Sequence, residues 1–176
     1  MELPDKIFLI GFMGSGKSTH GKRLARLLNR PFIDLDHYIE RKENKSIGEI
    51  FTKDGESHFR DLEKLYLNQV ISRYAQSVIS LGGGTPCFND NMNTILKNGL
   101  PIYIQMSPEA LFNRLSNSTN ERPLLMGKTK EQSLDFINET LTEREKYYIK
   151  ALIKVNGIDL TANKLVEELS LFIANN

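Results

Sequence analysis

The 176-residue chain contains a single cysteine, Cys87, no tryptophan, and no apolar run long enough to cross a membrane as a helix. One cysteine cannot form an internal disulfide, so the fold depends on a hydrophobic core, and a chain of this length can bury one. Charge is nearly balanced, because 23 lysines and arginines stand against 22 aspartates and glutamates. No overall field therefore favours nucleic acid or an anionic membrane as a partner, and any basic site is local.

The first residues show neither a basic leader nor an apolar segment of the length that a secretory signal needs. We therefore expect a cytoplasmic protein with no membrane partner. No internal repeat and no linker rich in proline, glycine or serine divides the chain, which predicts a single domain over residues 1–176. We expect it to be a monomer.

Residues 11–18, with the sequence GFMGSGKS, match the phosphate-binding pattern G-x-x-x-x-G-K-S/T and follow an apolar run at 7–10. Between a strand and a helix, such a loop points successive backbone N–H groups at a polyphosphate. Lys17 would contact the β and γ phosphates, and the hydroxyl of Ser18 would bind a magnesium ion. The alternative is a glycine-rich turn with an accidental Lys-Ser. The pattern favours a nucleoside triphosphate site.

Short apolar runs alternate with stretches whose apolar residues recur every three and four positions. The runs predict strands at 7–10, 32–34, 78–81, 102–105 and 153–155. Apolar stripes typical of helices are formed by Phe59, Leu62, Tyr66, Val70 and Tyr74, and by Leu165, Leu169, Phe172 and Ile173. Ser46 with Glu49 predicts a capping box, and Ser107 before Pro108 predicts a helix start. The order predicts an α/β fold with a five-stranded parallel sheet and helices on both faces.

Two carboxylates, Asp34 and Asp36, follow the second predicted strand, at the edge of the sheet where ligands gather. Residues two apart at a strand end point to the same side. One carboxylate could order a magnesium-bound water while the other accepts a substrate hydroxyl. Asp34 suits the first role, because Ser80 stands where many nucleotide-binding proteins place a magnesium-side aspartate. The alternative is that Asp36 caps a helix over 37–41 and Asp34 forms a turn.

Gly82, Gly83 and Gly84 follow the third predicted strand directly. Three glycines in a row favour close approach of the backbone to a ligand, and a turn that needs a positive φ is the alternative. Anion contacts could come from the planar guanidinium groups of Arg60, Arg122 and Arg144. Each of these arginines, taken singly, could instead be a solvated charge, and spacing does not show that they converge.

The remaining polar residues carry weaker signals. The histidines at 20, 37 and 58 lack metal-ligand spacing, and we interpret them as ordinary surface or interface residues. Cys87 is interpreted as an inert thiol. Residues 116–123 are dense in serine, threonine and asparagine and predict a mobile surface loop.

Seven segments resemble the shikimate kinases, a family of P-loop small-molecule kinases related to the nucleoside monophosphate kinases. They occur in family order and span most of the chain: GFMGSGKST at 11–19, FIDLD at 32–36, SIGEIF at 46–51, DGESHFR at 54–60, LGGG at 81–84, RPLL at 122–125 and EREKYY at 143–148. The resemblance implies a three-layer P-loop NTPase fold. It also implies transfer of the ATP γ-phosphoryl group to the 3-hydroxyl of shikimate, with Mg²⁺, in the chorismate pathway to aromatic amino acids.

The resemblance also implies roles for single residues and segments. The implied catalytic residues are Lys17, Asp36 and Arg122; the nucleotide-binding residues are Gly14, Ser15, Gly16, Lys17, Ser18, Thr19, Arg114 and Arg122; the shikimate-binding residues are Asp36, Arg60, Gly82, Gly83, Gly84 and Arg144; and Ser18 and Asp34 serve magnesium. A substrate-binding helical region is implied at about 34–62 and a mobile lid at about 116–129. Residues 156–159 differ from the adenine-contacting turn of the family.

Three other functions share the phosphate loop. A regulatory nucleotide switch is disfavoured, because neither the guanine-reading N-K-x-D pattern nor the D-x-x-G switch pattern occurs in the chain. A catalytically idle ATP-binding module is disfavoured because Asp36, Arg60, Arg122 and Arg144 are present together. A related P-loop kinase acting on another small hydroxy compound, such as gluconate, is the remaining alternative.

Overall fold

The computed structural model describes residues 3–117 and 127–175. Its strands form one parallel sheet in the order β2-β3-β1-β4-β5. The strands are β1 (Lys6–Ile10), β2 (Phe32–Asp34), β3 (Ser77–Ser80), β4 (Leu100–Gln105) and β5 (Ile153–Asn156). The predicted five-stranded parallel sheet is confirmed, with every strand end within two residues of its predicted position.

Helices connect these strands on both sides of the sheet. They are α1 (Lys17–Leu27), α2 (Leu35–Glu43), α3 (Ile47–Arg73), α4 (Asn91–Asn98), α5 (Pro108–Ser116), α6 (Lys130–Tyr148) and α7 (Ala162–Ala174), with a 3₁₀ turn at Thr85–Cys87. The predicted capping box of Ser46 and Glu49 begins α3, and Ser107 caps α5 before Pro108. In residues 3–117 and 127–175, no helix combines the length and apolar character that crossing a membrane requires.

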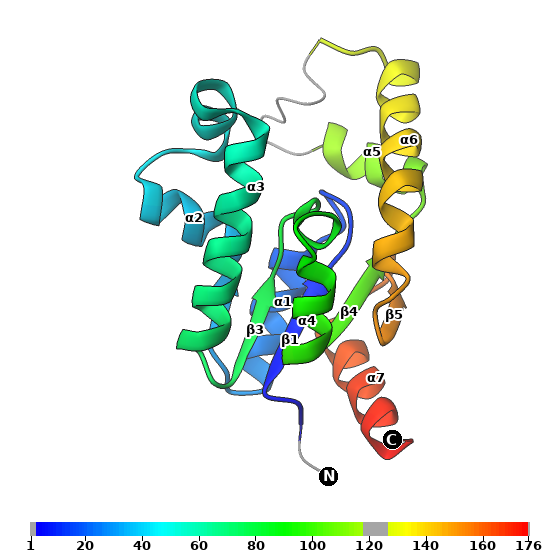
Figure 1. Ribbon diagram of the computed structural model, residues 1–176. Coiled ribbons are helices and arrows are strands. Elements are labelled where there is room, and N and C mark those ends of the chain that lie inside the picture. The colour runs from blue at the N-terminus through cyan, green and yellow to red at the C-terminus, as the bar shows by residue number, and fades with distance from the viewer. Residues whose placement is uncertain (1–2, 118–126, 176) are drawn as a thin grey trace.

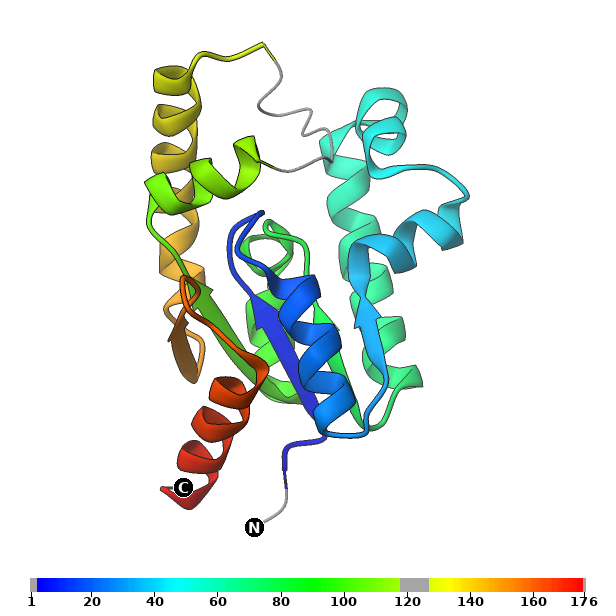
Figure 2. The same ribbon diagram turned by 180° about the vertical axis from the view of Figure 1, so that it is seen from behind.

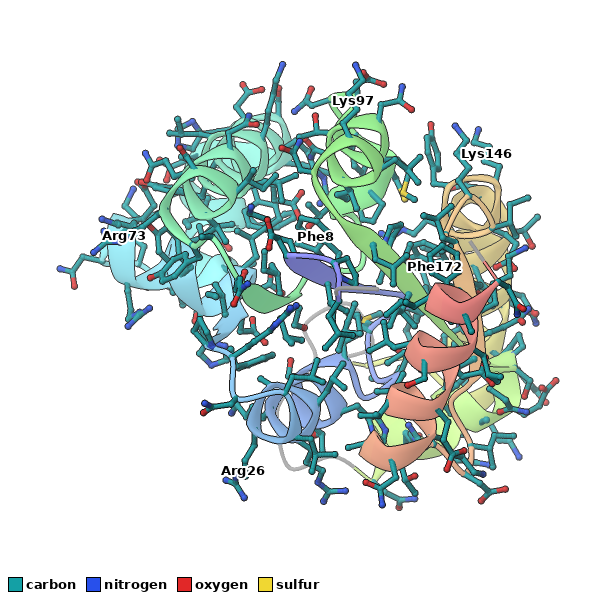
Figure 3. The ribbon with its side chains drawn as sticks, turned by 90° about the horizontal axis from the view of Figure 1, so that it is seen from below. Phe8, Arg26, Arg73, Lys97, Lys146 and Phe172 are labelled. Atoms are coloured by element: carbon teal, nitrogen blue, oxygen red, sulfur yellow. The ribbon has the colours of Figure 1, made fainter. Side chains whose placement is uncertain are left out.

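The sheet separates two apolar cores because successive side chains of a strand point to opposite faces. On one face, Phe8 and Ile10 of β1 pack with residues of α2, α3, α4 and α6. On the other face, Ile7 and Leu9 pack against α1 and α7. Figure 3 views this layering along the strands, with Phe8 in the centre and the labelled lysines and arginines on the rim. The structure is therefore the expected three-layer arrangement.

The parallel strands all end at the same edge of the sheet, where the loops after β1 and β3 lie side by side (Figure 1). The helix pair α2 and α3 stands on one side of these loops, and α5 and α6 stand on the other, as the reverse view also shows (Figure 2). α3 is interrupted at Gly55, whose backbone has φ of 85° and ψ of 166°. This edge therefore collects segments that are distant in sequence.

The structure changes the expected start of the second helix and leaves most of the predicted lid outside the described residues. The helix after β2 begins at Leu35 rather than at residue 37, and its N-cap is Asp34. The alternative in which Asp36 caps this helix is therefore wrong. The centre of the predicted mobile lid at 116–129, including Arg122, lies outside the described residues.

Candidate active site

The phosphate-binding loop lies between β1 and α1, as its pattern requires. Gly11, Gly14 and Gly16 have φ values of 141°, 81° and 93°, a region that other residues rarely adopt. A Cβ atom at Gly11 would lie 2.7 Å from the carbonyl oxygen of Ile104. The glycines therefore serve the backbone conformation of the loop, and α1 begins directly after them with its N-terminus facing the loop.

Lys17 is buried, and its ammonium group donates to the carbonyl oxygens of Gly11 and Phe12, both at 2.8 Å. The side chain thus folds back over the loop that it follows. Lysine is a compact point charge with three rotatable donors, so it can exchange a carbonyl for a phosphate oxygen by a small movement. The charge is already at the loop before a ligand binds.

Ser18 and Asp34 are brought together from α1 and β2. The Ser18 hydroxyl donates to Asp34 Oδ2 at 2.5 Å and lies 3.4 Å from the hydroxyl of Ser80. Hydroxyl and carboxylate oxygens are the ligands that magnesium prefers, and magnesium usually takes only one or two protein ligands beside phosphates and waters. These oxygens fit that ion, although no group of three or more histidine, cysteine or acidic side chains gathers anywhere in the described ranges.

Asp36 lies in the first turn of α2, where its Oδ1 atom is buried and has no hydrogen-bond partner. Burial raises the pKa of Asp36 to about 7, with further increases from the charges of Asp34 and Glu63 and an opposing effect from Lys17. An unpartnered buried carboxylate has unused acceptor capacity. A pKa near neutrality is also the value that suits a general base.

At the three consecutive glycines after β3, neighbouring side chains leave little room for a Cβ atom, whereas the backbone conformation does not require glycine. None of them is among the glycines with positive φ, so the tight-turn alternative is wrong. A Cβ atom would lie 2.7 Å from Asp36 Oδ1 at Gly82, and 2.5 Å from an Arg60 nitrogen at Gly84. At Gly83 it would lie 3.2 Å from an Arg144 nitrogen. Each glycine therefore makes room for one predicted substrate-site side chain.

The same glycines place this cluster beside the phosphate loop. A Cβ atom at Gly83 would lie 3.3 Å from the backbone nitrogen of Met13 and 3.5 Å from the carbonyl oxygen of Gly11. Asp36, Arg60 and Arg144, which come from α2, α3 and α6, thus meet within reach of residues 11–18. The structure thus brings Arg60 and Arg144 to neighbouring glycines, which spacing alone leaves open, while Arg122 lies outside the described residues.

Arg60 is held by two carboxylates and a set of aromatic rings. Its Nη1 donates to Glu63 at 2.7 Å, while Nη2 and Nε donate to Glu56 at 2.7 and 3.1 Å. The guanidinium carbon lies 4.2, 5.3 and 5.8 Å from the ring centres of Phe88, Phe59 and Phe51. Contacts of this kind leave little freedom to the guanidinium plane.

Glu63 is a site residue that sequence reasoning missed. Its side chain is only 1% exposed, pairs with Arg60, and accepts a hydrogen bond from the hydroxyl of Thr85. Burial raises the pKa of Glu63, against the opposing charge of Arg60. A signal was available, since Glu63 falls inside the apolar stripe of α3, beside Leu62 and three residues after Arg60.

Arg144 has a different environment from Arg60. It is half-buried on α6, and its guanidinium carbon lies 5.7 Å from the ring centre of Phe12 in the phosphate loop. Among the ion pairs of the described residues, Arg60 appears twice and Arg144 does not appear. It lies beside Gly83, next in the chain to Gly84, beside which Arg60 lies.

Arg114 joins the phosphate loop to the turn after β5. Its Nη1 donates to the carbonyl of Ser15 at 3.1 Å, and Nη2 donates to the carbonyls of Gly157 at 2.6 Å and Ile158 at 3.3 Å. The sequence at 156–159 differs from the family turn, yet the structure brings that segment to the nucleotide loop. Arg114 therefore ties the loop at 11–18 to the segment after β5.

His20 and Cys87 complete the surroundings. The interpretation of His20 as an ordinary surface or interface residue is wrong, because its side chain is 7% exposed within the chain and its ring lies against Gly16. Burial, with Arg114 and Arg23, lowers the pKa of His20 and favours the neutral ring. Burial raises the pKa of Cys87 to about 11, which keeps the thiol protonated and agrees with an inert residue.

Comparisons with known proteins point to one family. The sequence model of the family described as shikimate kinase matches residues 13–174. A curated shikimate kinase from Bacteroides thetaiotaomicron is 44% identical over 155 residues, 88% of each chain. The crystal structure of shikimate kinase from that organism superposes with a TM-score of 0.90 at 40% identity, covering 97% of this chain and 99% of the other. A structure of shikimate kinase from Acinetobacter baumannii in complex with shikimate has a TM-score of 0.85 at 36% identity, covering 99% and 95%.

Proposed function

Because this chain belongs to the shikimate kinase family, we propose that Asp36, Arg60 and Arg144 hold shikimate against ATP bound at residues 11–19. The enzyme transfers the γ-phosphoryl group of ATP to the 3-hydroxyl of shikimate and releases shikimate 3-phosphate and ADP. This reaction belongs to the biosynthesis of chorismate and the aromatic amino acids. The observation that carries the site assignment is the contact of Gly82, Gly83 and Gly84 with the three side chains, beside the phosphate loop.

The acceptor is recognised by its carboxylate and its hydroxyls. The guanidinium groups of Arg60 and Arg144 lie beside the adjacent glycines Gly84 and Gly83 and bind the carboxylate. A neutral sugar offers no anion to these guanidinium groups and is disfavoured. Gluconate also carries a carboxylate, so the arginines alone do not exclude it. The relatives that match more than 80% of the chain at 40–47% identity are shikimate kinases.

Asp36 orients the attacking hydroxyl and takes its proton. Its Oδ1 atom is buried with no other hydrogen-bond partner, so a substrate hydroxyl can satisfy it. The proton moves from that hydroxyl to Asp36 as the new bond to the γ-phosphorus forms and the bond to the β–γ bridging oxygen breaks. Phosphoryl transfer depends more on positioning and charge neutralisation than on covalent help, so orientation is the larger contribution.

Charge on the transferring group is balanced from the nucleotide side. Lys17 and the N–H groups of the loop formed by Gly14, Ser15, Gly16, Ser18 and Thr19 hold the phosphates. Arg114 contacts the base, and Arg122, outside the described residues, serves the transferring phosphate. Bound magnesium would neutralise phosphate charge, with Ser18 and Asp34 as its protein oxygens.

The wider organisation follows from the same assignment. Residues 1–176 form a single kinase domain, in which residues 34–62, including α2 and the start of α3, bind the acceptor and residues 116–129 form the lid. The enzyme acts as a cytoplasmic monomer on a small molecule and has no nucleic-acid or membrane partner.

A coupled assay of ADP release tests the proposal, with shikimate, quinate and gluconate supplied side by side at equal concentration. We expect ADP release that depends on both shikimate and Mg²⁺, with much lower rates for the other two acids. A higher kcat/KM for gluconate would reassign the acceptor. ATP binding without ADP release for any acceptor would favour the idle module.

A further inference from the structure

Tyr148, the last residue of α6, joins that helix to the glycines after β3. Its side chain is fully buried, and its hydroxyl donates to the carbonyl oxygen of Gly83 at 2.6 Å. Tyr148 lies four residues after Arg144, so both side chains are on one face of α6. The tyrosine therefore connects the helix that carries Arg144 to the glycine that Arg144 contacts.

The geometry of the peptide bond extends this contact to Gly84. No peptide bond in the described residues is cis, and in a trans peptide the C=O of one residue and the N–H of the next point in opposite directions. Because the Gly83 carbonyl points at Tyr148, the Gly84 N–H points away from it. The peptide unit between Gly83 and Gly84 is thus held in one orientation, with Arg144 close to its first residue and Arg60 close to its second.

The charge of Arg144 also reaches the tyrosine. Burial raises the pKa of Tyr148, and the charge of Arg144 acts in the opposite direction. The hydroxyl therefore lies in the field of Arg144 while it donates to the carbonyl of Gly83. Removing it would leave the Gly83 carbonyl, beside which the Arg144 guanidinium lies, without this donor.

We propose that Tyr148 is a positioning residue for the acceptor site, whose hydroxyl holds the peptide between Gly83 and Gly84 and the guanidinium of Arg144 in the arrangement that receives the substrate carboxylate. The proposal rests on the assignment of shikimate to this site. Tyr148 itself does not touch the reacting atoms. Its effect is on binding of the acceptor rather than on the nucleotide.

The test is Tyr148→Phe, which removes one oxygen and keeps the ring. An unsatisfied buried carbonyl weakens the site, and we expect KM for shikimate to rise about tenfold. KM for ATP should stay within about twofold, since Lys17 and Arg114 are untouched. A fall in the amount of folded enzyme would lower the apparent kcat but not change KM, so partial loss of folding does not hide the result.

Tyr103→Phe is a matched control. Tyr103 is equally buried, its ring centre lies 5.1 Å from that of Tyr148, and its hydroxyl donates to Glu145 on the same helix at 2.8 Å. We expect this variant to keep the wild-type KM for shikimate. An equal rise in both variants would overturn the proposal, because it would reflect general loosening of α6.

A double-mutant cycle with Arg144→Ala gives an independent measurement. If the tyrosine acts through Arg144 and its contact with Gly83, removing the hydroxyl should have less than half its effect on KM in the Arg144→Ala background. Full additivity would overturn the proposal. Failure of the functional assignment is distinguishable, since the wild-type enzyme would then show no shikimate-dependent ADP release at all, whereas an active wild type with an unchanged Tyr148→Phe variant sinks only the role of Tyr148.

Discussion

The nucleotide loop and the acceptor cluster lie side by side but are built in opposite ways. The nucleotide loop is one continuous segment, residues 11–19, whose shape is set by the positive φ values of its glycines. Lys17 donates hydrogen bonds to two backbone carbonyls of this loop. The acceptor cluster, as we call Asp36, Arg60 and Arg144, takes its side chains from α2, α3 and α6. Arg60 is held there by ion pairs with Glu56 and Glu63. The charge at the loop is ready to exchange partners, whereas Arg60 is oriented before any ligand binds.

The largest effect should come from removing the charge of Lys17 at the loop. Lys17→Ala should lower kcat by about a thousandfold, because the lysine neutralises charge that develops during transfer. Circular dichroism should show an unchanged fold, and steady-state kinetics measures the loss. A matched change, Lys22→Ala on the exposed side of α1, should leave kcat within about twofold. A Lys17→Ala variant that keeps a tenth of the wild-type kcat would contradict the assigned role.

Replacing either acceptor arginine should weaken shikimate binding, but only replacement of Arg60 should also destabilise the fold. Arg60→Ala and Arg144→Ala should each raise KM for shikimate strongly and leave KM for ATP near its wild-type value. Arg60→Ala also leaves Glu63 buried without its partner, which should lower the free energy of unfolding by about 3 kcal/mol. Arg144 has no such partner among the described ion pairs, so its variant should unfold near the wild-type denaturant concentration.

The same arginine variants also test whether the nucleotide loop and the acceptor cluster bind their ligands independently. Equal damage to ATP and shikimate binding in both variants would show that the cluster does not act as a separate acceptor site. Equal loss of stability would show that the buried pair of Arg60 and Glu63 has no special weight. Urea unfolding and the two KM values measure these outcomes on the same samples.

Titration of Asp36 should make the stability of the fold and kcat/KM for shikimate depend on pH in opposite directions. The pKa of Asp36 is raised to about 7 from 3.8, so between these values the folded state binds more protons than the unfolded state. The contribution of Asp36 to stability is therefore greatest below pH 4 and is lost as the pH rises through 7. In the role of a base that we propose for Asp36, its ionised form is the active one, so kcat/KM for shikimate should rise over the upper part of the same range.

Asp36→Asn separates these two effects. It removes the proton acceptor and should lower kcat by about a hundredfold. It also removes the titration, so the variant should unfold at a higher denaturant concentration than the wild type above pH 8. A wild-type stability that increases between pH 5 and 8 more steeply than that of the variant would contradict the raised pKa.

The smallest effect should come from the base end of the nucleotide site. Arg114→Ala removes the link from Ser15 to Gly157 and Ile158 and should raise KM for ATP about fivefold, since exposed or half-exposed hydrogen bonds of this kind contribute about 1 kcal/mol. KM for shikimate should not change. A comparable rise in both constants would indicate that Arg114 supports the whole loop rather than the base.

Sequence reasoning succeeded where the signal is local. The loop at 11–18 needs glycines at fixed spacing because the φ values of Gly11, Gly14 and Gly16 are positive. The central strands β1, β3 and β4 are recognisable because both of their faces are buried. The capping box of Ser46 and Glu49 is likewise a contact across three residues. Such features depend on near neighbours in the chain, so they can be predicted without knowing how the chain folds.

Other features were decided only by tertiary structure. Gly82, Gly83 and Gly84 suggested either a turn or a close approach, and only the positions of Asp36, Arg144 and Arg60 on three helices show which. The burial of His20 and the bond from Tyr148 to Gly83, across 65 positions, have no counterpart in local pattern.

Sequence by itself thus determined the alternating elements, the parallel sheet and the phosphate loop, because hydrophobic period and backbone conformation are properties of short segments. Tertiary structure decided which charged side chains share a buried space and which partner each one has. The physical reason is that burial and pairing set the charge state and orientation of Asp36, Arg60 and Glu63, and both arise only when α2, α3 and the loop after β3 pack together.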